Sequence, residues 1–426
     1  MVTYRTALAR QFLAHRFLAL MAALPLSAGC LWTRFDELAD ETWVDSLEKP
    51  DGVAANQWGE SFAEGIVGSS ALGTTISVLS KGAAAITSLV YDEAGTHSFI
   101  KTEGAIGAGR FETAFLDHHH LAASPTSSLV AFAVATTPDT RANTKVIVID
   151  AANNAAPQQF EPMAPSNMLA ATLGSQGLTF GASDNELWVT RTNQIMKLEI
   201  NPGGGNFVAC ALPDEAFAIA YADVDDDGTS DIVVASGANT DPLQPEAGRV
   251  WMLDPNTVTG NNIAALPTCG VRSGVPNSDA LAVGAGSRLV VADLGSGPRV
   301  VLSTLGGNGK LTVLNFTAGT PLIESTIPAQ GLASFAIGNV APASLTPEFV
   351  IGLPLLGQVK VLTPTGEELM TLSETAAESG NRFGNSVAVM PFGANRSVLV
   401  VGKPGNDPEV FVYFRTSLYD DVRAGR

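Results

Sequence analysis

Residues 382–413 read RFGNSVAVMPFGANRSVLVVGKPGNDPEVFVY and contain three short apolar stretches separated by turn residues. The stretches SVAVMP, VLVVGKP and VFVY are rich in valine, while Gly, Pro, Asn and Asp stand between them. Short apolar alternations of this kind predict strands, and the residues between them predict tight turns. The segment therefore predicts a small antiparallel sheet whose strands follow one another along the chain.

The same arrangement recurs along the chain. Closing alternations that resemble VFVY begin roughly 50 residues apart, at Ser98, Val146, Ile195, Val250, Leu311, Val359 and Val410. A regular repeat of short strands at this period is typical of β-propeller blades, which bury their sheet faces against their neighbours. A pair of β-sandwiches also has short strands and turns, but the steady period favours the propeller. We therefore expect an all-β fold, a β-propeller of about seven blades over residues 51–418, followed by a tail at 419–426.

The first 29 residues have the pattern of an export signal. A basic stretch without acidic residues precedes the apolar run FLALMAALPLSAG, and Cys30 follows directly. The run is shorter than a membrane-spanning helix requires. It resembles a bacterial lipoprotein signal, which implies cleavage after residue 29 and lipid attachment to Cys30. The alternative is plain secretion after ordinary cleavage. We expect residues 30–50 to form a linker and the protein to lie in the cell envelope, as an outer-membrane lipoprotein, or else in the periplasm or outside the cell.

Two further cysteines, Cys210 and Cys269, belong to the exported part of the chain. In an oxidising compartment they could form one disulfide, and the alternative is a pair of buried thiols.

The charge balance excludes two classes of partner. The chain has 426 residues, with 24 Lys and Arg against 42 Asp and Glu, and a formal net charge of −18. A nucleic-acid-binding surface would need basic residues, and so would adhesion to anionic lipid. We therefore expect no nucleic-acid partner and membrane contact only through the N-terminal lipid. We expect the protein to be a monomer.

One segment concentrates the acidic residues. It reads YADVDDDGTSDIVVASG from Tyr221 to Gly237. Counted from the first aspartate of DVDDDG, carboxylates occupy positions 1, 3, 5 and 9, with glycine at 6 and a backbone carbonyl available at 7. This spacing of oxygen ligands is typical of a Ca²⁺ loop, although the glutamate of an EF-hand at position 12 is missing. The alternative is an Asx-rich turn that holds itself by local hydrogen bonds. The predicted Ca²⁺ ligands are Asp223, Asp225, Asp227, Thr229 and Asp231.

The repeat resembles the FG-GAP repeat of integrin α-subunit propellers and of bacterial surface proteins. In residues 382–413, Phe383-Gly384 match the FG dipeptide and Gly402-Lys403-Pro404 match the GAP turn. Trp58-Gly59 stand where the first repeat would have FG. The resemblance implies an integrin-α-like propeller in which calcium loops rigidify some blades while recognition takes place elsewhere on the ring.

These features favour a calcium-binding, non-enzymatic module for binding or adhesion to a protein or glycan at the cell envelope. No set of catalytic residues is singled out. Propellers also carry hydrolases, lyases and quinone-dependent dehydrogenases, so an enzyme remains an alternative, as does a scaffold subunit of an envelope complex.

Overall fold

The computed structural model describes the following parts of the chain: residues 44–48, 58–63, 74–80, 85–91, 97–103, 121–123, 129–135, 144–150, 158–160, 177–191, 193–200, 207–237, 246–261, 265–284, 287–305, 307–317, 321–340, 346–374, 382–392, 396–405 and 408–414. The predicted signal, Cys30 and the tail at 419–426 lie outside these residues. The described part contains one 3-10 helix, η3 (Pro255–Thr257), and no α-helix. None of its helices is long and apolar enough to span a membrane.

Within the described residues, the strands form seven four-stranded antiparallel sheets. The first two sheets contain β2 (Trp58–Ala63), β3 (Thr74–Ser80), β4 (Ala85–Tyr91) and β5 (His97–Glu103), then β6 (Leu121–Ala123), β7 (Leu129–Ala135), β8 (Thr144–Asp150) and β9 (Gln158–Phe160). The next two contain β10 (Leu178–Phe180), β11 (Glu186–Arg191), β12 (Gln194–Glu199) and β13 (Phe207–Ala211), then β14 (Glu215–Ala222), β15 (Asp231–Gly237), β16 (Glu246–Leu253) and β17 (Val271–Val283). The last three contain β18 (Arg288–Asp293), β19 (Pro298–Thr304), β20 (Lys310–Asn315) and β21 (Leu322–Pro328), then β22 (Ser334–Gly338), β23 (Glu348–Leu353), β24 (Gln358–Leu362) and β25 (Glu368–Ser373), and finally β26 (Ser386–Phe392), β27 (Arg396–Lys403), β28 (Glu409–Phe414) and β1 (Val44–Glu48).

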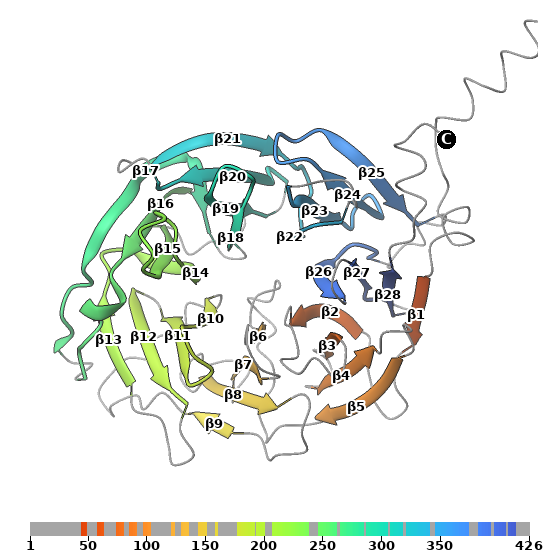
Figure 1. Cartoon of the computed structure of the whole chain (residues 1–426), viewed down its shortest axis with the longest axis horizontal. Helices are drawn as coiled ribbons and strands as arrows, with labels where there is room; N and C mark the ends of the chain where they lie inside the picture. The colour runs from red at the N-terminus through yellow and green to blue at the C-terminus, as the bar shows by residue number, and fades with distance from the viewer. Residues whose placement is uncertain are drawn as a thin grey trace, which may run out of the picture.

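The sheets are arranged in a ring around a common axis (Figure 1). The innermost strands β2, β6, β10, β14, β18, β22 and β26 each contact the innermost strand of the next sheet, and β26 contacts β2 again. In most sheets the following strands lie progressively farther from the axis. This arrangement confirms the all-β expectation and the β-propeller class.

The sheet that contains β14–β17 is buried on both faces because it is packed between two others. Strand β15 is the clearest example, since all of its residues are buried. Val233 and Ala235 pack toward the sheet that contains β18–β21, while Ile232 and Val234 pack toward the sheet that contains β10–β13. Successive side chains of a strand point to opposite faces, so an uninterrupted apolar run supplies both interfaces at once. The hydrophobic effect over these stacked faces is the main stabilising contribution to the ring.

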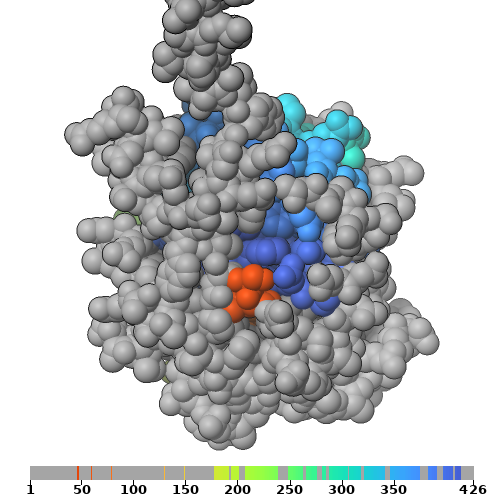
Figure 2. All heavy atoms as spheres, turned by 90° about the vertical axis from the view of Figure 1, so that its right-hand side faces the viewer, coloured from red at the N-terminus to blue at the C-terminus, as the bar shows by residue number. Residues whose placement is uncertain are grey.

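The N-terminal part of the described chain corrects one boundary. Residues 30–50 were expected to form a linker, but Val44–Glu48 form β1, which pairs antiparallel with β28. Leu47 is buried with Ala388, Val400 and Val412 of the same sheet. In Figure 2, orange atoms from the N-terminal part of the described chain lie against the blue atoms of the C-terminal sheet. The first strand therefore covers the outer edge of the last sheet, and an edge that is paired in this way is protected from pairing with another chain.

Glycines of the repeat form the junction between neighbouring sheets. Gly384 adopts a φ of 84°, and its carbonyl oxygen accepts a hydrogen bond of 3.2 Å from Ser334 Oγ on the preceding sheet. A Cβ added to Gly352 would collide with that same carbonyl oxygen. Glycine at both positions therefore allows the two backbones to approach closely.

Candidate metal centre

The acidic loop joins β14 to β15 at one end of their sheet. Its backbone is anchored by Val224, which is fully buried among Phe217, Val233 and Val250. The aspartates on either side of this valine are only partly buried. Because one residue between the two carboxylates is held in the core, both carboxylates are positioned by the rigid sheet rather than by a free loop.

The turn itself requires two residues in the left-handed region. Asp226 has a φ of 63° and Gly228 has a φ of 84°. A Cβ on Gly228 would meet nothing within 4 Å, so backbone conformation and not crowding explains the glycine. Asp223 accepts hydrogen bonds from the backbone N–H groups of Asp227 (3.2 Å) and Gly228 (2.8 Å), and Asp227 Oδ1 accepts one from the N–H of Thr229 (2.8 Å). Local hydrogen bonds within the loop therefore stabilise the turn.

Three of the predicted ligands converge. Asp223, Asp225 and Asp227 each offer a carboxylate oxygen, and these oxygens lie within 4.8 Å of one another. Among the described residues, this is the one group of three or more Asp, Glu, His or Cys side chains with ligand atoms this close. Carboxylates at such short separation repel one another, and a cation between them would relieve the repulsion.

Asp231 is placed differently from the other three aspartates. It begins β15, its side chain has no exposed surface, and its Oδ1 accepts a hydrogen bond of 2.7 Å from Arg272 Nη1. Burial raises the pKa of the Asp231 carboxyl above its usual value, although the hydrogen bond from Arg272 acts in the opposite direction. The structure therefore keeps Asp231 beside the converging trio but ties one of its oxygens to an arginine.

Two carboxylate oxygens in this region have no hydrogen-bond partner among the described residues. They are Asp231 Oδ2 and Asp225 Oδ1, and both atoms are buried. Buried polar atoms are nearly always satisfied, and leaving one unsatisfied costs about 1–3 kcal/mol. Hard oxygen atoms of this kind match the ligand preference of Ca²⁺. The donor set therefore fits a hard divalent cation. The role of the Thr229 backbone carbonyl as a further ligand stays a prediction.

The sequence pattern did not predict the contact of Arg272 with the acidic loop. Its Nη2 lies 2.9 Å from Asp227 Oδ2 and its Nη1 lies 2.7 Å from Asp231 Oδ1, although 45 and 41 residues separate the partners. The hydrogen bond from Arg272 lowers the pKa of the Asp227 carboxyl. No local sequence pattern predicts this contact. It arises because β15, β16 and β17 are antiparallel neighbours, so the starts of β15 and β17 lie at the same end of the sheet.

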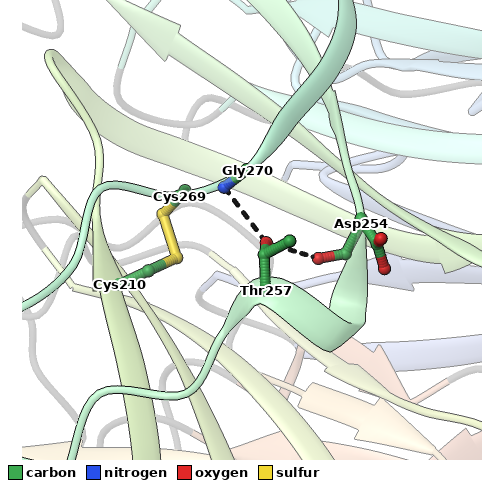
Figure 3. The surroundings of a disulfide bond; sticks show 5 residues. All are labelled: Cys210, Asp254, Thr257, Cys269 and Gly270. Carbon is green, nitrogen blue, oxygen red and sulfur yellow. Dashed lines mark hydrogen bonds between the residues drawn. A yellow bond between two sulfur atoms is a disulfide. The ribbon is translucent and has the colours of Figure 1, made fainter.

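A disulfide holds the chain just before Arg272. Cys210 of β13 is bonded to Cys269, with Cα atoms 4.9 Å apart, so the connection between β16 and β17 is tied to the neighbouring sheet (Figure 3). The backbone N–H of Gly270 donates to Thr257 Oγ1 at 3.0 Å, and Thr257 Oγ1 donates to the carbonyl of Asp254 at 2.7 Å. The start of β17 is therefore held in place by covalent and hydrogen bonds.

An equivalent loop in the following sheet has a different character. Between β18 and β19, Asp293 Oδ1 accepts hydrogen bonds from the backbone N–H groups of Gly295 (2.8 Å) and Gly297 (3.1 Å). A single aspartate here closes its own turn, which is the usual behaviour of an Asx turn. The comparison shows what the loop after β14 has in addition, namely further carboxylates that converge.

The ring of four-stranded sheets defines the class of the protein as a β-propeller. No protein-family model matches the sequence, and no curated protein matches it either. Solved structures with a similar fold include selenomethionine-substituted virginiamycin B lyase from Staphylococcus aureus, with 11% identity, a TM-score of 0.50 and coverage of 88% of this chain and 100% of that one. A catalytically inactive variant of the same lyase with Quinupristin has 12% identity, a TM-score of 0.52 and the same coverage. The β-propeller domain of Cps50 (Swd1) from Myceliophteria thermophila has 10% identity, a TM-score of 0.53 and coverage of 87% and 98%. At this identity, the similarities support the fold alone.

Proposed function

We propose that this protein is an exported, calcium-binding propeller of the FG-GAP type, which acts as a non-enzymatic binding module for a protein or glycan at the cell envelope. The observation that carries the proposal is the loop between β14 and β15. It combines three converging carboxylates with two buried carboxylate oxygens that lack partners. Calcium on this loop would be structural, because it would join the end of β14 to the start of β15 and stabilise one blade.

The ligand would be engaged by loops that connect the blades. In a propeller these loops are carried on a rigid ring, and loops on rigid scaffolds are the usual place for recognition. The lipid on Cys30 would hold the ring at the membrane without a spanning segment. Labelled palmitate incorporated into the wild type but not into Cys30→Ser would support the anchor, and equal labelling of both would refute it.

Calcium binding is tested by isothermal titration of the purified full chain with Ca²⁺, together with melting curves in calcium and in chelator. We expect wild type to bind one ion and to melt at a higher temperature in calcium. An affinity of about 10⁻⁴ to 10⁻³ M would be typical of an extracellular module. Wild-type melting curves that coincide with and without calcium would overturn the site.

The matched variants are Asp225→Asn and Asp226→Asn. Both remove one negative charge from the same loop, and asparagine tolerates the left-handed conformation that Asp226 adopts. Asp225 belongs to the converging trio, whereas the side chain of Asp226 is exposed and lies outside it. We expect Asp225→Asn to abolish the response to calcium and Asp226→Asn to keep it. Equal losses in both variants would indicate a general charge effect instead of a site.

Binding to the envelope is tested by a pull-down with the full chain in calcium and in chelator. A specific protein or glycan retained in calcium, and lost with Asp225→Asn, would support the binding function. If the same protein or glycan is retained without calcium and by Asp225→Asn, the binding function does not depend on the metal site.

A further inference from the structure

The guanidinium of Arg272 lies between two of the predicted calcium ligands. Its two terminal nitrogens contact Asp227 Oδ2 at 2.9 Å and Asp231 Oδ1 at 2.7 Å. An arginine side chain keeps its positive charge at every physiological pH, and its planar fork suits the bridging of two carboxylates. A permanent cation therefore lies on positions 5 and 9 of the loop, which are the positions that the sequence pattern assigns to the metal.

The arginine satisfies only part of this acidic site. Asp231 Oδ2 and Asp225 Oδ1 remain buried without a partner, and Asp231 has no exposed surface. One positive charge faces the four carboxylates of Asp223, Asp225, Asp227 and Asp231. The site therefore retains negative charge that the arginine does not neutralise and oxygen atoms that could bind a second cation.

A divalent ion on the trio would share Asp227 with the guanidinium. Calcium binds oxygen at 2.3–2.6 Å, so an ion on Asp227 and a guanidinium nitrogen 2.9 Å from Asp227 Oδ2 would be close neighbours of like charge. Their repulsion opposes binding of the ion, and the carboxylates they share cannot serve both with full strength. The geometry thus makes the arginine and a calcium ion compete for the carboxylate of Asp227.

The side chain of Arg272 can move while its backbone stays in place. Val271 is paired with Leu253 of β16, and the disulfide at Cys269 ties the preceding residues to β13. The Arg272 side chain itself is 35% exposed, so it has a direct route into solvent. Displacement of the guanidinium therefore needs a change of rotamer and no change of the sheet.

We propose that Arg272 is a built-in competitor of calcium: it holds Asp227 and Asp231 when the ion is absent, and it sets the calcium affinity of the loop by having to be displaced. This inference rests on the proposed calcium function and adds the residue that tunes it. The inference predicts the direction of the effect on calcium affinity. A competitor lowers the affinity, so its removal should raise it, whereas removal of a residue that merely positions the carboxylates should lower it.

The test is isothermal titration of the purified full chain with Ca²⁺, comparing wild type, Arg272→Gln and the control Arg249→Gln. Arg249 lies on the same sheet, forms a 3.2 Å ion pair with Asp214, and has a side chain that is 34% exposed. Both variants therefore remove one partly exposed, paired arginine and change the net charge equally. We expect Arg272→Gln to bind Ca²⁺ about tenfold more tightly or better, and Arg249→Gln to stay within about twofold of wild type.

Melting curves give a second readout. In chelator, Arg272→Gln should melt below wild type, because buried Asp231 loses its partner. In saturating calcium the difference should shrink, so the melting-temperature rise caused by calcium should be larger in the variant. A purely structural arginine would lower both curves equally, and that result would overturn the proposal.

The outcomes separate this inference from the proposed function. If wild type binds Ca²⁺ and Arg272→Gln binds equally or more weakly, the competitor role is wrong while the calcium site stands. If only Arg272→Gln binds, the competitor role is supported and calcium binding by the wild type is refuted. If neither binds, both proposals are wrong. Should Arg272→Gln fail to fold, Arg272→Lys replaces it, since a lysine ammonium cannot bridge two carboxylates as a fork. A gain of at least about twofold is then expected, and unchanged or weaker binding would overturn the role.

Discussion

Ser386 Oγ donates a hydrogen bond of 2.5 Å to the carbonyl oxygen of Gly59, although 327 residues separate the two. The preceding junction has the same contact, in which Ser334 donates to the carbonyl of Gly384 at 3.2 Å. Gly59 and Gly384 have nearly the same φ, 80° and 84°. The junction between the sheet of β26 and the sheet of β2, which closes the ring, is therefore built like the junction that precedes it.

Substitution of Gly402 should weaken this closure. A Cβ at Gly402 would collide with the carbonyl oxygen of Gly59 and with Ser386 Oγ. We expect Gly402→Ala to lower the free energy of unfolding by about 1–3 kcal/mol, because the tightly packed junction must shift. Gly307→Ala is the control, since a Cβ there meets nothing within 4 Å. Urea unfolding followed by fluorescence measures both, and equal midpoints for the two variants would contradict the role of this junction.

Gly228 should be replaceable by asparagine more easily than by alanine. Its φ of 84° is left-handed, while the space around it is open. An alanine in this conformation costs about 1–2 kcal/mol, whereas asparagine visits it more readily. We therefore expect Gly228→Ala to be less stable than Gly228→Asn when both are unfolded by urea in chelator. The reverse order would show that side-chain space and not φ selects the glycine.

Loss of the Cys210–Cys269 disulfide should destabilise the protein strongly. The bond closes a loop with a sequence separation of 59 residues, and a loop of this size corresponds to about 4 kcal/mol in the chain-entropy treatment. The double variant Cys210→Ser/Cys269→Ser should unfold at lower urea than wild type and should not respond to a reductant. Mass spectrometry after alkylation checks the bond directly, and two freely alkylated thiols in the purified wild-type protein would refute it.

Lys403 should make stability fall at high pH. Its side chain is 7% exposed and pairs with Glu374 and Glu409, each at 2.9 Å. Burial alone would lower its pKa, but the hydrogen bonds to Glu374 and Glu409 and the negative charges of these two groups together outweigh burial and raise the pKa above its ordinary value of 10.5. A raised folded-state pKa stabilises the folded state below the unfolded pKa, and this stabilisation is lost as pH rises through the folded-state value.

The check is to measure unfolding free energies of wild type and Lys403→Met between pH 7 and pH 11.5. The gap between them should be widest near neutral pH and should narrow above about pH 10.5. Lys360→Met is the control, because the Lys360–Glu368 pair is more exposed (28% and 48%) and should contribute less than about 1 kcal/mol. A gap for Lys403→Met that stays constant with pH would show that lost packing, not lost charge, explains the destabilisation.

Several parts of the fold and the site followed from local patterns. The alternation in residues 382–413 predicted short strands, because strand periodicity and turn chemistry act over a few residues. The recurrence of this alternation along the chain predicted the ring. The spacing of Asp223, Asp225 and Asp227 around Gly228 predicted a sharp acidic turn for the same reason. The structure has that turn, and the carboxylates of all three aspartates converge in it.

Other parts depended on pairing between distant segments. Nothing in VDSLE marks residues 44–48 as the partner of β28, because a short edge strand has a weak pattern of its own and acquires its place only when the ring closes.

What the sequence determined by itself was therefore the strands, the turns, the repeat that predicts a propeller, and a loop whose carboxylates lie within nine residues. What the tertiary structure decided was which distant groups meet them. Arg272 reaches Asp231 across 41 residues only because three antiparallel strands bring the starts of β15 and β17 to the same end of one sheet. The reason is physical: backbone propensity acts between neighbours in the chain, whereas the partner of a buried charge is chosen by the packing of the whole sheet.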